Sequence, residues 1–160
     1  MKRLRGIHIA VAALLVVALL LGTWQSISAQ FITNDTWAIG RQGIFVPGGF
    51  SQDNVELTRV HHSEVRGGPV IFKRPLLRLQ YFNNEGSSLG IPFALTYVFY
   101  NLHGFEVRDW ERGNLGIWYL DTTTSTWRSC NAFQTKLQNG DARIACVAPQ
   151  STLFGLGKEQ

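Results

Sequence analysis

The sequence predicts an all-β protein, an antiparallel β-sandwich or Greek-key barrel of about nine or ten short strands, preceded by an N-terminal signal or anchor helix. After position 30, short apolar runs alternate with polar residues at the two-residue period of a strand. Loops rich in Gly, Pro and Asn separate these runs. No segment of about ten or more residues after position 30 has the apolar period of a helix. These features together favour strands over helices.

The clearest strand and turn signals lie between residues 115 and 147. Residues 115–120 are largely apolar on both faces, which predicts a strand covered on both sides. Residues 121–125 are short polar side chains that bond their own backbone and favour a turn. A strand is expected to restart at residues 126–128.

Asn139-Gly140 is the strongest hairpin signal, because a type I′ turn needs positive φ at both central residues. A two-residue loop at this pair sets the pairing of the two strands around it. In that register the facing pairs are Leu137 with Ala142, Thr135 with Ile144, and Phe133 with Cys146.

The remaining segments divide the chain into four parts. Residues 1–29 form the targeting segment, 30–42 lead into the domain, 43–156 form the β-sandwich, and 157–160 form a frayed tail. The other strands are expected at 43–46, 55–60, 70–72, 76–82, 93–100, 105–110 and 152–156.

The first 29 residues have the pattern of an export signal. Lys2, Arg3 and Arg5 form a basic start, and residues 7–21 are an apolar run interrupted by His8. Residues 27–29, Ile-Ser-Ala, resemble a cleavage site. An uncleaved signal anchor is the alternative, because extending the apolar run to Trp24 gives a length closer to a membrane span. We therefore expect a chain that is either secreted or tethered to the outer face of the membrane.

The basic balance of the chain belongs mostly to this targeting segment. Without residues 1–29 the Lys and Arg count falls from 15 to 12, the 11 acidic residues remain, and the net charge falls from +4 to +1. Nucleic-acid binding needs clustered basic residues, so no nucleic-acid partner is expected. Contact with a membrane is expected only through residues 7–21, if the signal is uncleaved.

Cys130 and Cys146 both lie in the exported part, and an oxidising compartment favours a disulfide between them. Two reduced, buried cysteines are the alternative. A bridge over a loop of this length would stabilise the fold by about 3 kcal/mol in the chain-entropy model.

Candidate catalytic groups are poorly supported, and we expect no enzyme activity, no metal and no cofactor. His61, His62 and Glu64 could be zinc ligands, but no second ligand cluster accompanies them and a solvated loop is favoured. Glu106, Asp109 and Glu111 could form a glycosidase pair, but they alternate with arginines and are expected on an exposed edge. No Gly-x-Ser-x-Gly turn occurs.

The aromatic residues suggest a binding surface as well as a core. Trp110, between Asp109 and Glu111, is the best candidate for exposure, and Arg108 and Arg112 beside it could add hydrogen bonds to a ligand. The aromatic residues expected in the core are Trp118, Tyr97, Phe99 and Trp127.

Several motifs resemble the zonula-occludens/Unc-five-type β domain of ankyrins and netrin receptors, which has looser relatives among exported bacterial proteins. They are Val46-Pro47-Gly48-Gly49-Phe50 followed by the strand VELTRV, the run 90–100, the pattern of 115–127, and the closing strand 148–156. The resemblance implies a β-sandwich with an interaction or structural role, and it carries no catalytic residues. Gly49 stands where that family usually has a small alanine.

These observations favour an exported, non-enzymatic β-sandwich module with a structural or protein-interaction role at or outside the cell envelope. A carbohydrate-binding module that uses exposed aromatic residues is the second hypothesis, and a small secreted hydrolase is the third. The expected partner is accordingly a protein or a cell-surface glycan.

Overall fold

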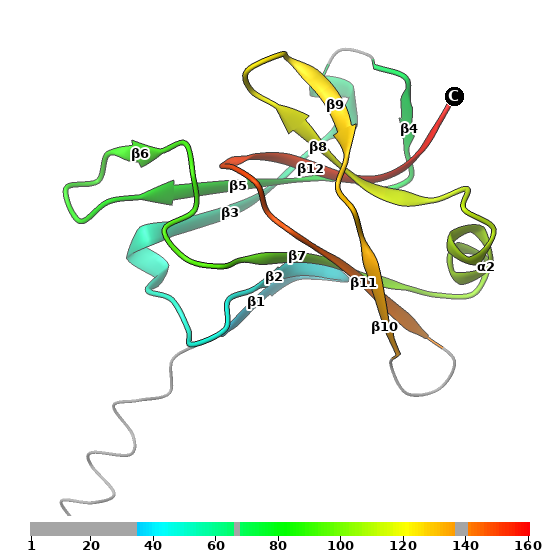
Figure 1. Cartoon of the computed structure of the whole chain (residues 1–160), viewed down its shortest axis with the longest axis horizontal. Coiled ribbons are helices and arrows are strands. Elements are labelled where there is room, and N and C mark those ends of the chain that lie inside the picture. Colours follow the sequence, from blue (N-terminus) through cyan, green and yellow to red (C-terminus); the bar gives the residue numbers. More distant parts are fainter. Residues whose placement is uncertain (1–34, 66–67, 137–140) are drawn as a thin grey trace, which may run out of the picture. The chain divides into compact units, whose positions relative to one another are not determined.

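The computed structural model describes residues 35–65, 68–136 and 141–160. Two antiparallel sheets pack face to face in this part of the chain (Figure 1), which confirms the predicted β-sandwich. Sheet A has the strand order β1-β2-β7-β11-β10, and sheet B has the order β3-β5-β12-β8-β9. Two short strands extend sheet B, because β4 pairs with β12 and β6 pairs with β5.

The strands of sheet A are β1 (Thr36–Ile39), β2 (Gln42–Phe45), β7 (Tyr97–Leu102), β10 (Phe133–Lys136) and β11 (Ala142–Val147). The strands of sheet B are β3 (Val55–Val60), β4 (Val70–Phe72), β5 (Leu76–Phe82), β6 (Ser88–Leu89), β8 (Gly116–Asp121), β9 (Thr126–Ser129) and β12 (Thr152–Glu159). Two 3-10 helices, η1 (Gln52–Asn54) and η2 (His62–Glu64), flank β3, and one short α-helix, α2 (Phe105–Glu111), follows β7.

The main core lies between the two sheets, where alternate residues of each strand point inward. Sheet A contributes Ile44, Val98, Tyr100 and Ile144, and sheet B contributes Leu77, Leu79, Tyr81, Ile117 and Phe154, all fully buried. The two-residue alternation that predicted strands therefore also selects the side chains that hold the sheets together.

A second, smaller core covers the outer face of sheet B. Val60, Val70, Leu76 and Trp127 are buried there, with Phe72 and Trp118 packed against them. The rings of Phe72 and Trp127 lie 4.5 Å apart. The segment that carries β4 therefore folds over sheet B and shields this face from water.

Strand β1 lies within residues 30–42, which were expected only to lead into the domain. Its pairing places Ile39 opposite Gln42, which leaves Gly40-Arg41 as a two-residue turn, with φ of +67° at Gly40. Glycine at the first central position is itself a hairpin signal. This strand is not evident from the sequence, because it is only four residues long.

The C-terminal tail is also ordered, contrary to the expectation that residues 157–160 fray. Gly157, Lys158 and Glu159 pair with the three residues of β4. A side chain at Gly157 would lie 2.7 Å from Val70 Cγ1 and 2.8 Å from Ile71 O, so glycine allows this close approach.

Residues 105–110 were expected to add a strand, and this prediction is wrong, because they belong to helix α2. Gly104 precedes the helix with φ of +53°, and at the other end Arg112 N–H donates a hydrogen bond to Arg108 O. Glu106, Val107 and Trp110 turn inward and Phe105 outward. This inward set has helical spacing rather than strand alternation, but a seven-residue helix is too short to show a clear period in sequence.

The turn predicted at residues 121–125 is confirmed between β8 and β9. Asp121 Oδ1 accepts a hydrogen bond from Thr123 N–H at 2.9 Å. This bond holds the pKa of Asp121 below its usual range, and Thr124 and Arg128 act in the same direction. Ser125 completes the turn with φ of +54°.

Candidate functional site

The outer face of sheet A carries a shallow groove that the main core does not use. The groove has a volume of about 320 Å³ and is formed by side chains of β2, β7, β10 and β11 and the residue after Val46. Its lining is Phe45, Pro47, Tyr97, Phe99, Phe133, Thr135, Arg143 and Ala145. We call it the sheet A groove.

Strand pairing explains why these side chains meet. Phe45 pairs with Tyr97 and Phe133 pairs with Ala145, and paired residues of antiparallel strands point to the same face. The buried residues Ile44 and Val98 are the sequence neighbours of Phe45 and Tyr97, and they point to the opposite face. The groove is therefore lined by the outward-pointing side chains of the strands whose inward-pointing side chains form the core.

A shift of one residue in the hairpin decides the place of Phe133. The predicted register paired Phe133 with Cys146 and Thr135 with Ile144, and this register is wrong. Phe133 pairs with Ala145 and Thr135 with Arg143. Because a one-residue shift moves a side chain to the other face of the sheet, Phe133 lies on the outer face.

The turn that predicted the other register, Asn139-Gly140, lies outside the described residues. The paired residues nearest to that turn are Lys136 of β10 and Ala142 of β11. Five residues therefore separate the paired strands, where a two-residue loop would leave two. Longer hairpin loops of three to five residues are common alternatives to a type I′ turn.

The aromatic rings in the groove meet at different angles. Phe45 and Tyr97 have ring centroids 6.1 Å apart and planes 29° apart. Tyr97 and Phe133 lie 6.0 Å apart with perpendicular planes at 90°. The rings therefore form the walls of a groove rather than one flat platform.

Arg143 supplies the cationic group of the groove. Its guanidinium carbon lies 4.3 Å from the centre of the Phe99 ring, within the range of a cation–π contact. Arg143 Nε donates a hydrogen bond to Asn101 Oδ1 at 2.8 Å. These two contacts fix the guanidinium against the sheet and position it beside the aromatic rings.

The outer faces of the two sheets thus differ. In sheet B the segment before β4 covers the face so closely that a side chain at Gly68 would lie 2.6 Å from Trp127 Cδ1. In sheet A the side chains of Phe133 and Val147 are each 47% exposed. Among the described residues, large apolar side chains on this face remain open to solvent. Such an open apolar face is typical of a binding surface.

The residues predicted to contact a ligand lie on or just after helix α2. Trp110 is half-buried, packs against the main core, and donates a hydrogen bond from Nε1 to Gln134 Oε1 at 2.8 Å. Arg108 and Arg112 are exposed on and after helix α2. Trp110 is therefore only partly exposed, because α2 turns its ring toward the sandwich, and its contact with a ligand stays a prediction.

The four residues expected in the core have different surroundings. Trp127 is buried and Trp118 is half-buried, both in the smaller core on sheet B, and Trp118 Nε1 donates to Gly157 O at 3.2 Å. Phe99 is 2% exposed but lies on the outer face under Arg143. The core assignment of Tyr97 is wrong, because its half-buried ring lines the sheet A groove.

The three carboxylates considered for glycoside hydrolysis have different surroundings. Glu106 is buried and accepts a hydrogen bond at Oε1 from Arg74 Nε at 2.9 Å, with a second contact between Arg74 Nη2 and Oε2. Asp109 is half-buried and Glu111 is exposed. The prediction that Glu106 lies on an exposed edge is wrong, because its partner is 32 residues away in sequence.

The histidine cluster forms a local turn. His61 Nδ1 lies 2.7 Å from Ser63 Oγ, and the rings of His61 and His62 stack with centroids 4.4 Å apart. In the part of the chain that the structure describes, no three His, Cys, Asp or Glu side chains gather in a group able to hold a metal ion.

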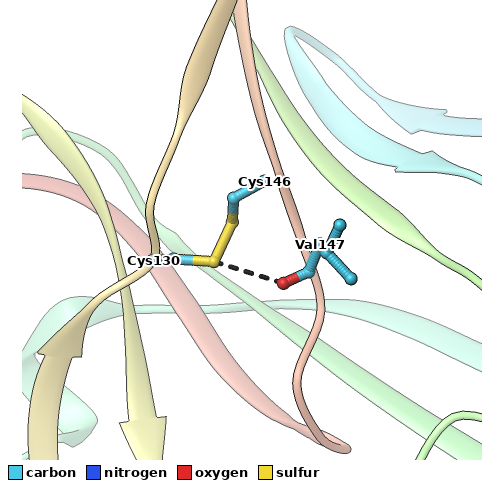
Figure 2. The surroundings of a disulfide bond; sticks show 3 residues. All are labelled: Cys130, Cys146 and Val147. Carbon is cyan, nitrogen blue, oxygen red and sulfur yellow. Dashed lines mark hydrogen bonds between the residues drawn. A yellow bond between two sulfur atoms is a disulfide. The ribbon is translucent and has the colours of Figure 1, made fainter.

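Cys130 and Cys146 form a disulfide with Cα atoms 5.9 Å apart, as the sequence predicted. Cys130 Sγ also lies 3.5 Å from Val147 O, and Figure 2 shows how these residues are arranged. Since a disulfide sulfur has no proton to donate, this is a close contact rather than a hydrogen bond. The bridge ties the segment between β9 and β10 to β11, next to the groove.

Sequence reasoning missed the groove residues Phe45, Phe133 and Arg143. Arg143 lies between Ala142 and Ile144 on an amphipathic strand, so its exposure could be read from alternation. That four strands meet at one groove could not be predicted from the sequence, because it depends on the order of the strands in the sheet.

The fold and the groove define a class: an antiparallel β-sandwich with an aromatic groove on one outer face. No family model, curated protein or solved structure matches the chain. The resemblance to the zonula-occludens/Unc-five-type domain therefore stays a prediction.

Proposed function

We propose that the chain is an exported, non-enzymatic β-sandwich module that binds a protein partner at or outside the cell envelope through the sheet A groove. The single observation that supports this most directly is the open aromatic face of sheet A. The other outer face is covered by the chain itself, so the open face is not a general consequence of the fold. Aromatic residues and arginine are the types enriched where protein partners bind.

The chemistry of the groove favours an apolar or aromatic side chain of the partner. Its walls are the rings of Phe45, Tyr97 and Phe133. Arg143 lies beside them and suits a carboxylate or a backbone carbonyl of the same partner. Strand β10 ends the described strand order of sheet A. An extended segment could therefore pair along β10 while one side chain enters the groove.

A carbohydrate-binding role has weaker support. Sugar rings stack on exposed aromatic faces that share a plane, whereas Tyr97 and Phe133 are perpendicular. The groove lining also offers few polar side chains for sugar hydroxyls, namely Tyr97, Thr135 and Arg143.

A hydrolase has weaker support still. Glu106 is engaged by Arg74, so it is not poised as a general acid or base, and His61 and Ser63 are exposed on a local turn. The binding role requires no further chemistry from these residues.

The experiment that tests the binding role places a photo-crosslinking residue at Phe133 in cells that express the full chain. The matched control is Phe105, another exposed phenylalanine, which is 62% exposed and lies on α2 outside the groove. A discrete protein adduct is expected at Phe133 and not at Phe105.

The adduct is then identified, and its affinity for the full chain is measured with Phe133→Ala and Phe105→Ala. Loss of a central aromatic contact is expected to weaken binding about tenfold or more in Phe133→Ala, which corresponds to at least about 1.4 kcal/mol, and to leave Phe105→Ala unchanged. Equal affinities, or binding to a glycan that Phe133→Ala abolishes, would contradict the proposal.

A further inference from the structure

A second apolar surface lies at one end of the sandwich, in residues 90–96 between β6 and β7, which we call the tip loop. Ile91 is 73% exposed, Phe93 49% and Leu95 53%. Large apolar side chains this exposed, three within five residues, are unusual in a soluble monomer. Val147, which is 47% exposed, lines the same surface.

The tip loop is held by hydrogen bonds at both ends. Gly90 O accepts from Ser151 N–H at 2.9 Å, and Thr96 O accepts from Ala148 N–H at 2.8 Å. The Phe93 ring meets Tyr81 edge-on at 5.3 Å. The exposed side chains therefore belong to a fixed part of the fold.

The sequence on both sides of the tip loop contains no Asp, Glu, Lys or Arg. This stretch runs from Ser87 to Phe105. The sheet A groove differs, because Arg143 gives it a charged group that can recognise a polar partner. An exposed, uncharged apolar loop instead suits the lipid phase, where no group has to be recognised.

The tip loop lies at the end of the domain where the chain enters it. Asp35 O accepts a hydrogen bond from Val46 N–H, and the next residue, Thr36, pairs with Phe45. Phe45 pairs with Tyr97, which directly follows the tip loop. Figure 1 shows β1 and the start of β7 at this end and α2 beyond the other end of β7.

The chain before Asp35 includes the apolar run 7–21, and 13 residues lie between that run and Asp35. A chain of 13 residues spans at most about 45 Å when fully extended. A domain tethered by the apolar run would therefore stay near the bilayer, with the tip loop at the tethered end.

From these observations we infer that the tip loop contacts the phospholipid bilayer, with Ile91 and Leu95 entering its interface. The inference rests on the proposed export of the chain. It makes the tip loop, and not only the apolar run, a membrane contact, and it leaves the sheet A groove free for a protein partner.

The test uses the full chain reconstituted in vesicles of phosphatidylethanolamine and phosphatidylglycerol. An environment-sensitive fluorophore is attached at Ile91→Cys, at Leu95→Cys, or at the control Phe105→Cys. The native cysteines form a disulfide and do not compete for the label. Phe105 is a fair control because it is 62% exposed and apolar but lies at the opposite end of β7.

Doxyl-labelled lipid is expected to quench the probes at 91 and 95 several-fold more than the probe at 105. Aqueous iodide is expected to quench in the reverse order. Equal quenching by iodide at all three positions would overturn the inference, and so would protection at 91 that appears only when other envelope proteins are added. Neither outcome affects crosslinking at Phe133, so failure here is distinguishable from failure of the proposed function.

Discussion

At the scale of single residues, the ion pair between Arg74 and Glu106 is the interaction that sequence reasoning could not reach. Arg74 also donates from Nη2 to Asn101 O at 2.9 Å, and His103 N–H donates to Glu106 Oε2 at 3.2 Å. The two side chains are 11% and 7% exposed. Their charges therefore face each other in the interior, where an unpaired charge is costly.

We predict that Glu106→Ala lowers the free energy of unfolding by about 3–5 kcal/mol, because it leaves the Arg74 guanidinium buried without a counter-charge. Urea denaturation of the purified chain measures the change. Glu111→Ala is the control, since Glu111 is exposed on the same helix and should change stability by less than about 0.5 kcal/mol. Similar values for both variants would show that the pair does not stabilise the fold.

Residues whose burial follows from the strand period could be assigned from the sequence. Trp127 is buried, and alternating apolar patterns find such residues because burial follows from the strand period. Glu106 and Tyr97 were misplaced because a charge or a ring can lie on either side of a sheet or helix. Their surroundings come from residues far away in the chain.

At the scale of elements, the hairpin of β10 and β11 shows how local signals can mislead. Asn-Gly favours a two-residue turn, but the pairing of Lys136 with Ala142 requires a longer connection. Strand β11 pairs with β7 over six residues, from Ala142 with Leu102 to Val147 with Tyr97. We infer that this long interior pairing, rather than the turn, sets the position of β11.

The disulfide is the covalent link within this group of strands. It closes a loop with a sequence separation of 16. We predict that replacing both cysteines by serine lowers the free energy of unfolding by about 3 kcal/mol, because the unfolded chain gains the conformations that the loop excludes. Urea denaturation under oxidising conditions measures the difference.

Dithiothreitol provides the internal control for this prediction. It should destabilise the native chain to the level of the double variant and leave the variant unchanged. A native chain that loses less than about 1 kcal/mol on reduction would contradict the prediction, since a loop of this length should contribute about 3 kcal/mol.

At the scale of the whole molecule, the packing of the two sheets buries a tyrosine from each. Tyr81 lies in β5 of sheet B and Tyr100 in β7 of sheet A, and both side chains are fully buried. Burial raises the pKa of Tyr81 to about 12 and raises the pKa of Tyr100 further, although Arg74 partly opposes the second shift.

We predict that the domain loses stability as the pH rises above about 10, the pKa of an unburied tyrosine. Between pH 10 and 12 the folded state keeps phenolic protons that the unfolded state releases, so the free energy of unfolding falls with pH. The full contribution is present below pH 10. Tyr81 alone should account for a loss of roughly 2–3 kcal/mol by pH 12.

Tyrosinate absorbance and circular dichroism, recorded together during alkaline titration, check this prediction. Two of the four tyrosines should ionise only as the strand signal is lost. Tyr81→Phe should reduce the dependence of stability on pH. Ionisation of all four near pH 10 with the strand signal intact would contradict the burial of Tyr81 and Tyr100.

The sequence by itself determined the all-β class and most strand positions, because these follow from a two-residue period and from turn residues. It favoured a bridge between the two cysteines but left two reduced cysteines as the alternative. The tertiary structure alone decided that one outer face is covered and the other open, and that four strands bring their side chains together on the open one. The physical reason is that alternation separates the two faces of a strand without saying what packs on either. Strand order and register, which join residues far apart in the chain, make that choice.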